Sequence, residues 1–364
     1  MKNKDILLLP KYTEKGPSSR YRLFQYVPLL RESFTISISP FFDESYIESL
    51  LAGNQPPIFS ALMSFFRRVF KIIFISSKNT KLVLIEYELI PYFPSIFESL
   101  LKLKGINFLT IYDDAVFHRY DKSDNFIIKL ILGNKIKNVM KKSSAVIVGN
   151  KYLEKYAINA TNSKVYLLPT VVDTNLYQAK KIFSETIRIV WIGSPSTSKY
   201  LSRVDKILKN LSKDYSFEVI VIGANNFQFS EDITQSYVDY NDSNESSNLD
   251  EYDIGIMPLF DSDWEKGKCG FKLIQYMASG LPTIADNVGA NSDITINGTT
   301  GFLCNSDSDW HNSLKLLMEN KTLRMELGSN GVKRARKLYS LDSTKENLLG
   351  IVKESLGKNR SEER

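Results

Sequence analysis

Cysteine is scarce in this chain, which has two cysteines among 364 residues. Cys269 and Cys304 cannot build a disulfide framework, so the sequence favours a reducing compartment. Long apolar runs are also missing, because no stretch reaches the ~18–20 uncharged apolar residues that span a bilayer. The apolar run near the start, Ile6–Leu9, is too short for the core of a signal peptide and fits a buried strand better. We therefore expect a cytoplasmic protein.

Two common phosphate-binding signatures are absent as well. Gly193 ends an apolar segment but has no further glycine at the offsets of a dinucleotide fingerprint, and no Walker A pattern occurs. The turn at Gly193 is therefore not a dinucleotide fingerprint.

The composition is that of a folded protein, with 43% hydrophobic and 24% charged residues. Apolar, β-branched runs alternate with helix-like stretches, which predicts parallel sheets covered by helices on both faces. In the first half, the predicted strands are Ile6–Leu9, Phe34–Ser39, Leu82–Glu86, Phe108–Tyr112, Ala145–Gly149 and Val165–Leu168. The predicted helices there are Ser19–Arg31, Pro94–Leu103 and Asn125–Lys141.

The same alternation restarts after a connector at Pro169–Tyr177. The predicted strands of the second half are Ile187–Ile192, Phe217–Gly223, Ile254–Pro258, Pro282–Ala285 and Gly301–Cys304. The predicted helices are Lys199–Leu211, Phe271–Ser279, Trp310–Glu319 and Leu341–Leu356. We therefore expect two doubly wound, Rossmann-like domains, residues 1–170 and 171–340, that face each other across a cleft. Residues 341–364 would add a helix that packs back on the first domain, followed by a frayed tail.

Charge is divided unevenly between the halves. Up to Thr170 the chain has 24 Lys and Arg against 14 Asp and Glu, and the remainder has 23 against 27. A basic first half favours an anionic partner such as an anionic lipid or a phosphorylated substrate, although basic residues also simply solvate a surface. Nucleic acid is not expected, because the basic residues are not interleaved with aromatic residues as a stacking platform.

Two turns of the second half suit a phosphate. In the first, Gly193 and Ser194 follow a strand and lead to Lys199 at a helix start, where backbone amides can hold an anion. In the second, a loop that contains Gly270 leads into a helix whose first turn carries Lys272. A cation at a helix N-terminus is unfavourable unless an anion joins it. An ordinary strand-to-helix turn and a surface lysine are the alternative interpretations.

The second of these segments resembles the donor-binding signature of glycosyltransferase family four. The resemblance lies in Phe271-Lys-Leu-Ile-Gln-Tyr-Met-Ala-Ser-Gly-Leu-Pro, Ala285-Asp-Asn-Val-Gly and Asn297-Gly-Thr-Thr-Gly-Phe-Leu. Segments of the first half, including Ser18-Ser-Arg-Tyr-Arg and Val148-Gly-Asn-Lys-Tyr-Leu, resemble members that assemble bacterial surface polysaccharides such as lipopolysaccharide.

The resemblance implies a GT-B fold and a retaining glycosyltransferase (EC 2.4) that needs no metal and no cofactor. The second domain would bind a nucleoside-diphosphate sugar through Gly193, Ser194, Lys199, Gly270, Lys272 and Gln275. The first would bind a saccharide acceptor, which we expect to be a lipid-linked oligosaccharide at the inner face of the membrane.

This sequence departs from the family at its pair of glutamates, which falls on Gly267 and Gln275. Gln275 would meet the donor ribose with a neutral amide, and Glu265 or Asp263 is a candidate to replace the first carboxylate. The arginine that many members carry after the first glycine falls on Ser194. We therefore expect Lys199 and Lys272 to supply most of the positive charge that binds the phosphates.

Candidate residues of the first domain lie at the ends of its predicted strands. The catalytic candidates are Asp113, Asp114 and His118, although a lone histidine is more often structural. The candidates for the acceptor or the cleft are Gly16, Ser18, Arg20 and Glu86.

A basic amphipathic segment spans residues 61–75. On a helical wheel, Arg67, Arg68 and Lys71 share one side and apolar residues occupy the other. The sequence predicts either an interfacial membrane helix or a packed helix with its basic residues outward. Asp261-Ser-Asp263 mimics a metal-binding Asp-X-Asp motif, but a solvated acidic loop explains it better.

Two other functions stay open. A nucleotide-sugar epimerase on the same fold would need carboxylates or histidines in the cleft, and the chain has two histidines. A non-catalytic subunit that binds a nucleotide sugar would explain the missing glutamates. The need for an acceptor distinguishes a transferase from both.

Overall fold

A computed structural model describes residues 6–180, 186–239 and 248–357. The chain forms two compact units. Unit 1 comprises Met1–Thr170, Gly267–Cys269 and Thr344–Arg364, and unit 2 comprises Val171–Lys266 and Gly270–Ser343. Lys358 and the charged tail beyond it, expected to fray, lie outside the described residues.

Unit 1 is built on a six-stranded parallel sheet in the order β2-β1-β3-β4-β5-β6. Its strands are β1 (Ile6–Leu9), β2 (Ile36–Ile38), β3 (Leu82–Glu86), β4 (Asn107–Tyr112), β5 (Ala145–Val148) and β6 (Lys164–Leu167). The central strands are apolar and buried throughout, as expected for a sheet covered on both faces. The chain runs from β1 to one side and then returns to β3, so the winding reverses between these two strands. Ligands of such sheets bind beyond the carboxyl ends of the strands at this reversal.

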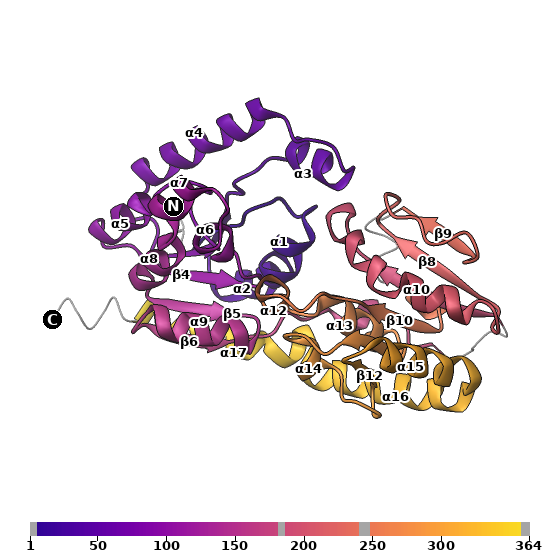
Figure 1. The fold of residues 1–364 in the computed structure, drawn as a ribbon. Helices are drawn as coiled ribbons and strands as arrows, with labels where there is room; N and C mark the ends of the chain where they lie inside the picture. The colour runs from indigo at the N-terminus through magenta and orange to yellow at the C-terminus, as the bar shows by residue number, and fades with distance from the viewer. Residues whose placement is uncertain (1–5, 181–185, 240–247, 358–364) are drawn as a thin grey trace. The chain divides into compact units, whose positions relative to one another are not determined.

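Helices cover the sheet of unit 1 (Figure 1). They are α1 (Pro17–Arg22), α2 (Val27–Ser33), α3 (Glu44–Leu51), α4 (Ile58–Phe74), α5 (Ile96–Leu103), α6 (His118–Asp121), α7 (Phe126–Leu132), α8 (Lys135–Lys142), α9 (Lys151–Ala160) and α17 (Leu341–Gly357). A short 3₁₀ helix, η1 (Phe24–Tyr26), lies between α1 and α2. The single helices predicted over Ser19–Arg31 and Asn125–Lys141 are thus divided.

The last helix, α17, packs on unit 1. Tyr26 Oη lies 2.8 Å from Thr344 Oγ1, and Tyr166 Oη donates to Glu354 at 2.6 Å. Leu348 and Val352 are buried in α17. The C-terminal segment of the chain thereby belongs to the same unit as the first strand.

The orientation of α4 differs from the interpretation as a packed helix, which turned all three basic residues outward. Arg68 is 2% exposed, and its guanidinium donates to the carbonyl oxygens of Ser39 at 2.9 Å and Pro10 at 3.4 Å. Arg67 donates to Phe41 O at 2.6 Å. The carbonyl groups of neighbouring loops therefore hold two of the basic side chains, and Arg68 points inward.

Unit 2 is built on a second six-stranded parallel sheet, in the order β12-β11-β10-β7-β8-β9. Its strands are β7 (Ile187–Ile192), β8 (Phe217–Ile222), β9 (Gln235–Val238), β10 (Ile254–Met257), β11 (Thr283–Asp286) and β12 (Gly301–Cys304). The winding reverses between β7 and β10, which places the expected ligand crevice beyond the ends of these strands.

Among the described residues of unit 2, three helices are of the 3₁₀ type and the others are α-helices. The 3₁₀ helices are η2 (Thr174–Leu176), η3 (Pro195–Leu201) and η4 (Leu249–Glu251). The α-helices are α10 (Ser202–Leu211), α12 (Asp263–Lys266), α13 (Phe271–Ala278), α14 (Asn291–Ile294), α15 (Asp307–Glu319) and α16 (Lys321–Leu338). Across the described ranges, no helix has both the length and the apolar character needed to cross a membrane.

Candidate active site

In unit 1, a network of hydrogen bonds surrounds Glu86 at the carboxyl end of β3. Its Oε2 accepts from the backbone amide of Lys11 at 2.7 Å and from Ser19 Oγ at 2.5 Å. Its Oε1 accepts from Ser18 Oγ at 3.0 Å. Lys11 of the loop after β1 and the start of α1 are thus fixed to the end of β3, at the reversal of the winding.

Asp113, directly after β4, joins the same network. Ser18 Oγ lies 3.2 Å from Asp113 Oδ2 and 3.0 Å from Tyr87 Oη. Tyr87 Oη also donates a hydrogen bond to Asp113 Oδ1. Tyr87 has φ +64°, a left-handed conformation that is uncommon for a residue with a side chain. We call Ser18, Glu86, Tyr87 and Asp113 the hydroxyl–carboxyl cluster.

The electrostatics of this cluster favour proton exchange near neutral pH. Burial, together with the nearby carboxylates of Asp114 and Glu86, raises the pKa of Asp113 to about 7. Burial also raises the pKa of Glu86, against the hydrogen bonds from Ser19 and Lys11. Carboxyl groups with raised pKa values beside hydroxyl groups are candidates for general acid–base roles. The cluster can hydrogen-bond a hydroxyl group and accept its proton.

Three of the predicted residues of unit 1, namely Ser18, Glu86 and Asp113, therefore meet in one place. Asp114 acts on Asp113 through its charge. Gly16 precedes α1, and a Cβ atom there would come closer than 3.0 Å to Tyr12, so the position requires glycine. Arg20 lies in the last turn of α1 with its guanidinium 5.4 Å from the Tyr21 ring.

His118 has contacts of another kind. Its Nδ1 lies 2.8 Å from Asp121 Oδ1 and its Nε2 lies 2.8 Å from Tyr152 Oη. The ring also packs edge-on against Phe117, with centroids 4.5 Å apart. Both ring nitrogens are thus engaged within the fold. The contacts favour the structural alternative for this residue over the catalytic one.

A second buried network near the cluster was not foreseen from the sequence. Lys135, which is 3% exposed, forms an ion pair with Glu88 and donates to Ile90 O at 2.6 Å. Tyr120 Oη lies within 2.9 Å of both carboxylate oxygens of Glu88. The network fixes the loop that follows Tyr87. The run Glu86-Tyr-Glu88 directly after a buried strand is the signal that could have indicated it.

In unit 2, the turn after β7 depends on glycine. A Cβ atom at Gly193 would lie closer than 3.0 Å to the Trp191 ring and to Thr197 Oγ1. Thr197 Oγ1 donates to Ser194 O at 2.9 Å, which closes the turn. The expected helix start at Lys199 is wrong in detail, because that residue lies within the 3₁₀ helix η3 and α10 begins only at Ser202.

The start of α13 comes close to this turn. Gly270 precedes the helix with φ +63°, and a Cβ atom there would come closer than 3.0 Å to Ile294. Lys272 Nζ lies 5.1 Å from the centroid of the Trp191 ring. Lys272 and Gly193 therefore both lie close to one buried tryptophan near the carboxyl end of β7, where the reversal of the winding predicts a ligand.

The two positions of the family's glutamates are occupied differently. Gln275 is buried, and its Nε2 donates to Tyr177 Oη at 3.3 Å. At Gly267, which belongs to unit 1, a side chain would come closer than 3.0 Å to Ala115. The loop is held by Asn150 Nδ2, which donates to Gly267 O at 3.0 Å. The backbone at Gly267 therefore has no room for the glutamate that relatives carry.

The acidic residues near Gly267 differ in their burial. Glu265 is 5% exposed and accepts hydrogen bonds from Tyr200 Oη at 2.6 Å and from Ser262 Oγ. Lys266 Nζ pairs with Asp261 at 3.2 Å and with Asp263 at 3.7 Å. The Asp-X-Asp pair thus belongs to an exposed ion-paired turn. In the described part of the chain, no group of three potential metal ligands occurs. The independence from metals and cofactors stays a prediction.

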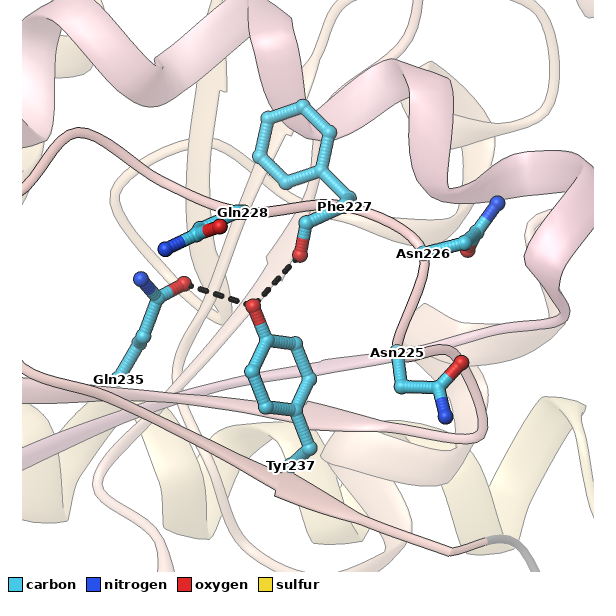
Figure 2. A pocket seen from close by; sticks show the side chains of 6 residues that line it. All are labelled: Asn225, Asn226, Phe227, Gln228, Gln235 and Tyr237. Atoms are coloured by element: carbon cyan, nitrogen blue, oxygen red, sulfur yellow. Dashed lines mark hydrogen bonds between the residues drawn. The ribbon is translucent and has the colours of Figure 1, made fainter.

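A polar pocket of about 490 Å³ lies beyond the end of β8 (Figure 2). Its lining residues are Asn225, Asn226, Phe227, Gln228, Gln235 and Tyr237. Tyr237 Oη lies 2.7 Å from Phe227 O and 3.0 Å from Gln235 Oε1. Asn226 connects the pocket to the turn after β7, because its Nδ2 donates to Pro195 O at 3.0 Å. The sequence did not indicate this pocket, because strand β9 is polar and was not predicted from the pattern of apolar residues.

Comparison with solved structures establishes the class of fold. A sucrose-phosphate synthase from Thermosynechococcus elongatus is 13% identical with a TM-score of 0.70, and the match covers 98% of this chain and 100% of that one. Anabaena HepE in complex with UDP and glucose is 13% identical with a TM-score of 0.69, covering 97% and 100%. An α,α-trehalose 6-phosphate synthase from Burkholderia multivorans is 10% identical with a TM-score of 0.63, covering 99% and 98%. These likenesses confirm the expected GT-B fold.

The sequence of unit 2 is similar to a known family. Residues 186–320 match the model of a family described as glycosyl transferases group 1. No curated protein matches the sequence. The matched residues carry Gly193, Lys199, Lys272 and Gln275. These residues of unit 2 are similar to that group of glycosyltransferases, and the similarity supports sugar transfer as the reaction. The expected family-four likeness and enzyme class are thereby confirmed.

Proposed function

We propose that this chain is a retaining glycosyltransferase that moves a sugar from a nucleoside-diphosphate sugar to a lipid-linked saccharide acceptor. The product would be a bacterial surface polysaccharide, assembled in the cytoplasm at the inner face of the membrane. The identity of the pathway rests on the sequence resemblance. The enzyme would need neither a metal nor a cofactor.

The arrangement at the end of β7 carries the proposal for the donor. Lys272 lies over the Trp191 ring, beside the tight turn at Gly193, and Lys199 follows that turn. As the sugar bond breaks, negative charge accumulates on the leaving diphosphate. Cations and backbone amides fixed around that position stabilise the transition state. Related folds have been crystallised with UDP and with UDP-glucose, which supports a nucleoside-diphosphate sugar.

The hydroxyl–carboxyl cluster carries the proposal for the acceptor. Ser18 and Tyr87 place two hydroxyl groups beside the carboxyl group of Asp113, whose pKa is raised to about 7. Such a group can orient a sugar hydroxyl and accept its proton as the new bond forms. In a retaining reaction the departing phosphate can also guide the incoming hydroxyl, so Asp113 need not act alone.

A panel of nucleotide sugars tests the proposal. Each donor is incubated with a lipid-pyrophosphate-linked oligosaccharide, and both nucleoside diphosphate release and the anomeric configuration of the product are measured. We expect one donor to react, only when acceptor is present, with retention. Isomerisation of the donor without acceptor would instead indicate an epimerase. Tight binding of donors with no turnover under any acceptor would indicate a non-catalytic subunit.

A further inference from the structure

The helix α4 exposes its apolar side. Its buried residues are Ser60, Ser64, Arg68 and Ile72, so its most polar side faces the unit. The residues on its outer side are large and apolar. The exposed ones are Ile58, Phe59, Leu62, Met63, Phe66, Phe70, Ile73 and Phe74. Phe59 is 72% exposed and Phe74 is 77% exposed. A soluble surface rarely shows an apolar stripe of this length without a partner.

A second exposed apolar side lies on α7. Phe126, Ile127, Leu130 and Ile131 are each more than half exposed, at 74%, 64%, 71% and 63%. The order of the strands places α4, α5 and the α6–α8 segment on one face of the sheet, because the chain crosses in one direction from β2 through β5 and such crossovers are right-handed. Helix α4 packs against α5, and α5 packs against α8. We call the exposed apolar residues of α4 and α7 the apolar face.

The charged residues of α4 and α7 are all basic. The sequence has no Asp or Glu between Glu48 and Glu86, and none between Asp124 and Glu154. Both intervals contain basic residues, and Lys71 and Lys129 are exposed on α4 and α7 themselves. An apolar surface whose own helices carry only basic charged residues complements an anionic lipid surface.

We propose that the apolar face inserts into the interfacial region of the leaflet that it meets in an anionic bilayer, and that this insertion attaches the enzyme to the membrane. With 17 residues, α4 is too short to span a bilayer and would lie along the interface, with its rings among the acyl chains. A second copy of the chain is a poorer occupant. A twofold contact through this face would bring the basic residues of one copy against those of the other, which opposes association.

The apolar face also lies near the proposed acceptor site. Helix α4 leads directly into β3, so its last turn is at the amino edge of the sheet and its first turn is toward the carboxyl edge, where Glu86 and Asp113 lie. A lipid-linked acceptor could keep its lipid in the bilayer while its sugar reaches the cluster. The delivery of a lipid-linked acceptor to the cluster rests on the proposed function, whereas the attachment to the membrane does not.

A tryptophan placed on the apolar face tests insertion directly. The three native tryptophans, Trp191, Trp264 and Trp310, all belong to unit 2. Phe70→Trp therefore adds the first such reporter to unit 1, and Met325→Trp on exposed α16 is the matched control. With vesicles of phosphatidylethanolamine and phosphatidylglycerol that carry brominated acyl chains, we expect quenching of the added fluorescence only for Phe70→Trp. Equal quenching of both variants, or of neither, would overturn the proposal.

Removal of the apolar side chains gives the second test. The triple variant Phe59→Ser, Phe66→Ser, Phe70→Ser should reduce partitioning into the same vesicles by about 100-fold, because each ring loses its transfer into the acyl region. The control is Leu176→Ser, Leu316→Ser, Met325→Ser, which removes exposed apolar residues of unit 2.

The outcomes separate attachment from catalysis. For the triple variant, we expect an unfolding temperature within a few degrees of the parent's. Its turnover of a water-soluble acceptor should stay within twofold of the parent's. Unchanged vesicle binding in the triple variant, or a change in its oligomeric state in place of vesicle binding, would refute the membrane as the occupant. Lost vesicle binding in a protein that transfers no sugar would retain this inference and contradict the proposed function.

Discussion

Asp113, in the hydroxyl–carboxyl cluster, should make the stability of the protein depend on pH. The pKa of its carboxyl group is raised from 3.8 to about 7 in the folded chain. Between these values the native state holds a proton that the unfolded state releases. The stability contributed by this group is therefore complete below about pH 4 and is lost as the pH rises through about 7. Asp113→Asn should remove that dependence, so its unfolding temperature relative to the parent should increase from pH 5 to pH 8.

The same substitution should impair catalysis. We expect kcat/KM to fall by ~10²–10⁴-fold, and the parent rate to rise with pH near 7, as the carboxylate forms and can accept a proton. Affinity for the nucleotide, measured by calorimetry, should stay unchanged. Asp124→Asn, at an exposed position of unit 1, is the control. An Asp113→Asn enzyme with the parent's rate and pH profile would remove this residue from the mechanism.

Lys272 is predicted to bind the donor diphosphate. It lies in the first turn of α13, inside the family-matched region, and its Nζ is 5.1 Å from the centroid of the Trp191 ring beside the turn at Gly193. Lys272→Ala removes a charged hydrogen bond of ~1.5–3 kcal/mol, so kcat/KM should fall roughly 10- to 150-fold. Lys315→Ala, on the exposed side of α15, controls for the loss of a positive charge. A normally folded Lys272→Ala enzyme within twofold of the parent would contradict the assignment.

The position of a functional residue can be predicted from the sequence when the residue lies at the end of a predicted strand. Glu86 and Asp113 directly end or follow buried strands, and parallel strands bring such ends together. Such prediction fails where tertiary contacts decide the environment. The wheel of α4 separates basic from apolar residues correctly, but the carbonyl groups of Ser39 and Pro10 accept Arg68, and these partners are distant in sequence. The strained conformation of Tyr87 likewise has no local signal.

At the scale of elements, the hydrophobic pattern locates nearly all strands but not the breaks within helices. The predicted helix over Ser19–Arg31 divides at Leu23, whose φ of −127° is not helical. Strand β9 was missed because it is short, polar and at the sheet edge, where little burial shapes the sequence. Element type follows from periodicity, whereas local breaks depend on packing that the pattern does not record.

The packing of α16 on α13 gives a prediction for an element. A Cβ atom at Gly328 would lie closer than 3.0 Å to the carbonyl oxygen of Gly280, which ends α13 with φ +74°. Backbone cannot yield easily, so Gly328→Ala should destabilise unit 2 by about 1–3 kcal/mol. The corresponding loss is roughly 2–4 °C in unfolding temperature per kcal/mol, measured by tryptophan fluorescence.

Gly350→Ala in α17 is the matched control for this substitution. No atom lies within 4 Å of its Cβ position, so alanine should leave stability unchanged or raise it by up to about 1 kcal/mol through helix propensity. Equal effects of the two substitutions would show that the close approach of α16 to α13 is not what requires Gly328. Loss of donor affinity in Gly328→Ala would further indicate that α16 positions the helix that carries Lys272.

At the scale of the whole molecule, the alternation of strands and helices was sufficient to predict two Rossmann-like units. The reason is that each βαβ unit is local in sequence and its handedness is fixed. Assignments that depend on distant segments are harder to obtain. Gly267–Cys269 belongs to unit 1 although its sequence neighbours belong to unit 2, and only three-dimensional contacts show this.

The return of the chain to unit 1 through α17 leads to the last prediction. Leu348 and Val352 bury their side chains there, and Glu354 accepts from Tyr166 at 2.6 Å. A chain that ends at Ser343 loses these contacts, and each buried apolar side chain is worth ~1.5–3 kcal/mol. Unit 1 should then unfold at a lower temperature than in the parent, although its own strands are intact.

Two probes can distinguish the units in this experiment. All three tryptophans belong to unit 2, so their fluorescence follows that unit, whereas far-ultraviolet circular dichroism follows both. For the chain that ends at Ser343, we expect an early circular dichroism transition with a smaller shift in the fluorescence transition. A chain that ends at Gly357 keeps the described contacts of α17 and serves as the control. Coincident, unshifted transitions in the shorter chain would mean that α17 contributes little to unit 1, and its buried residues would then need another explanation.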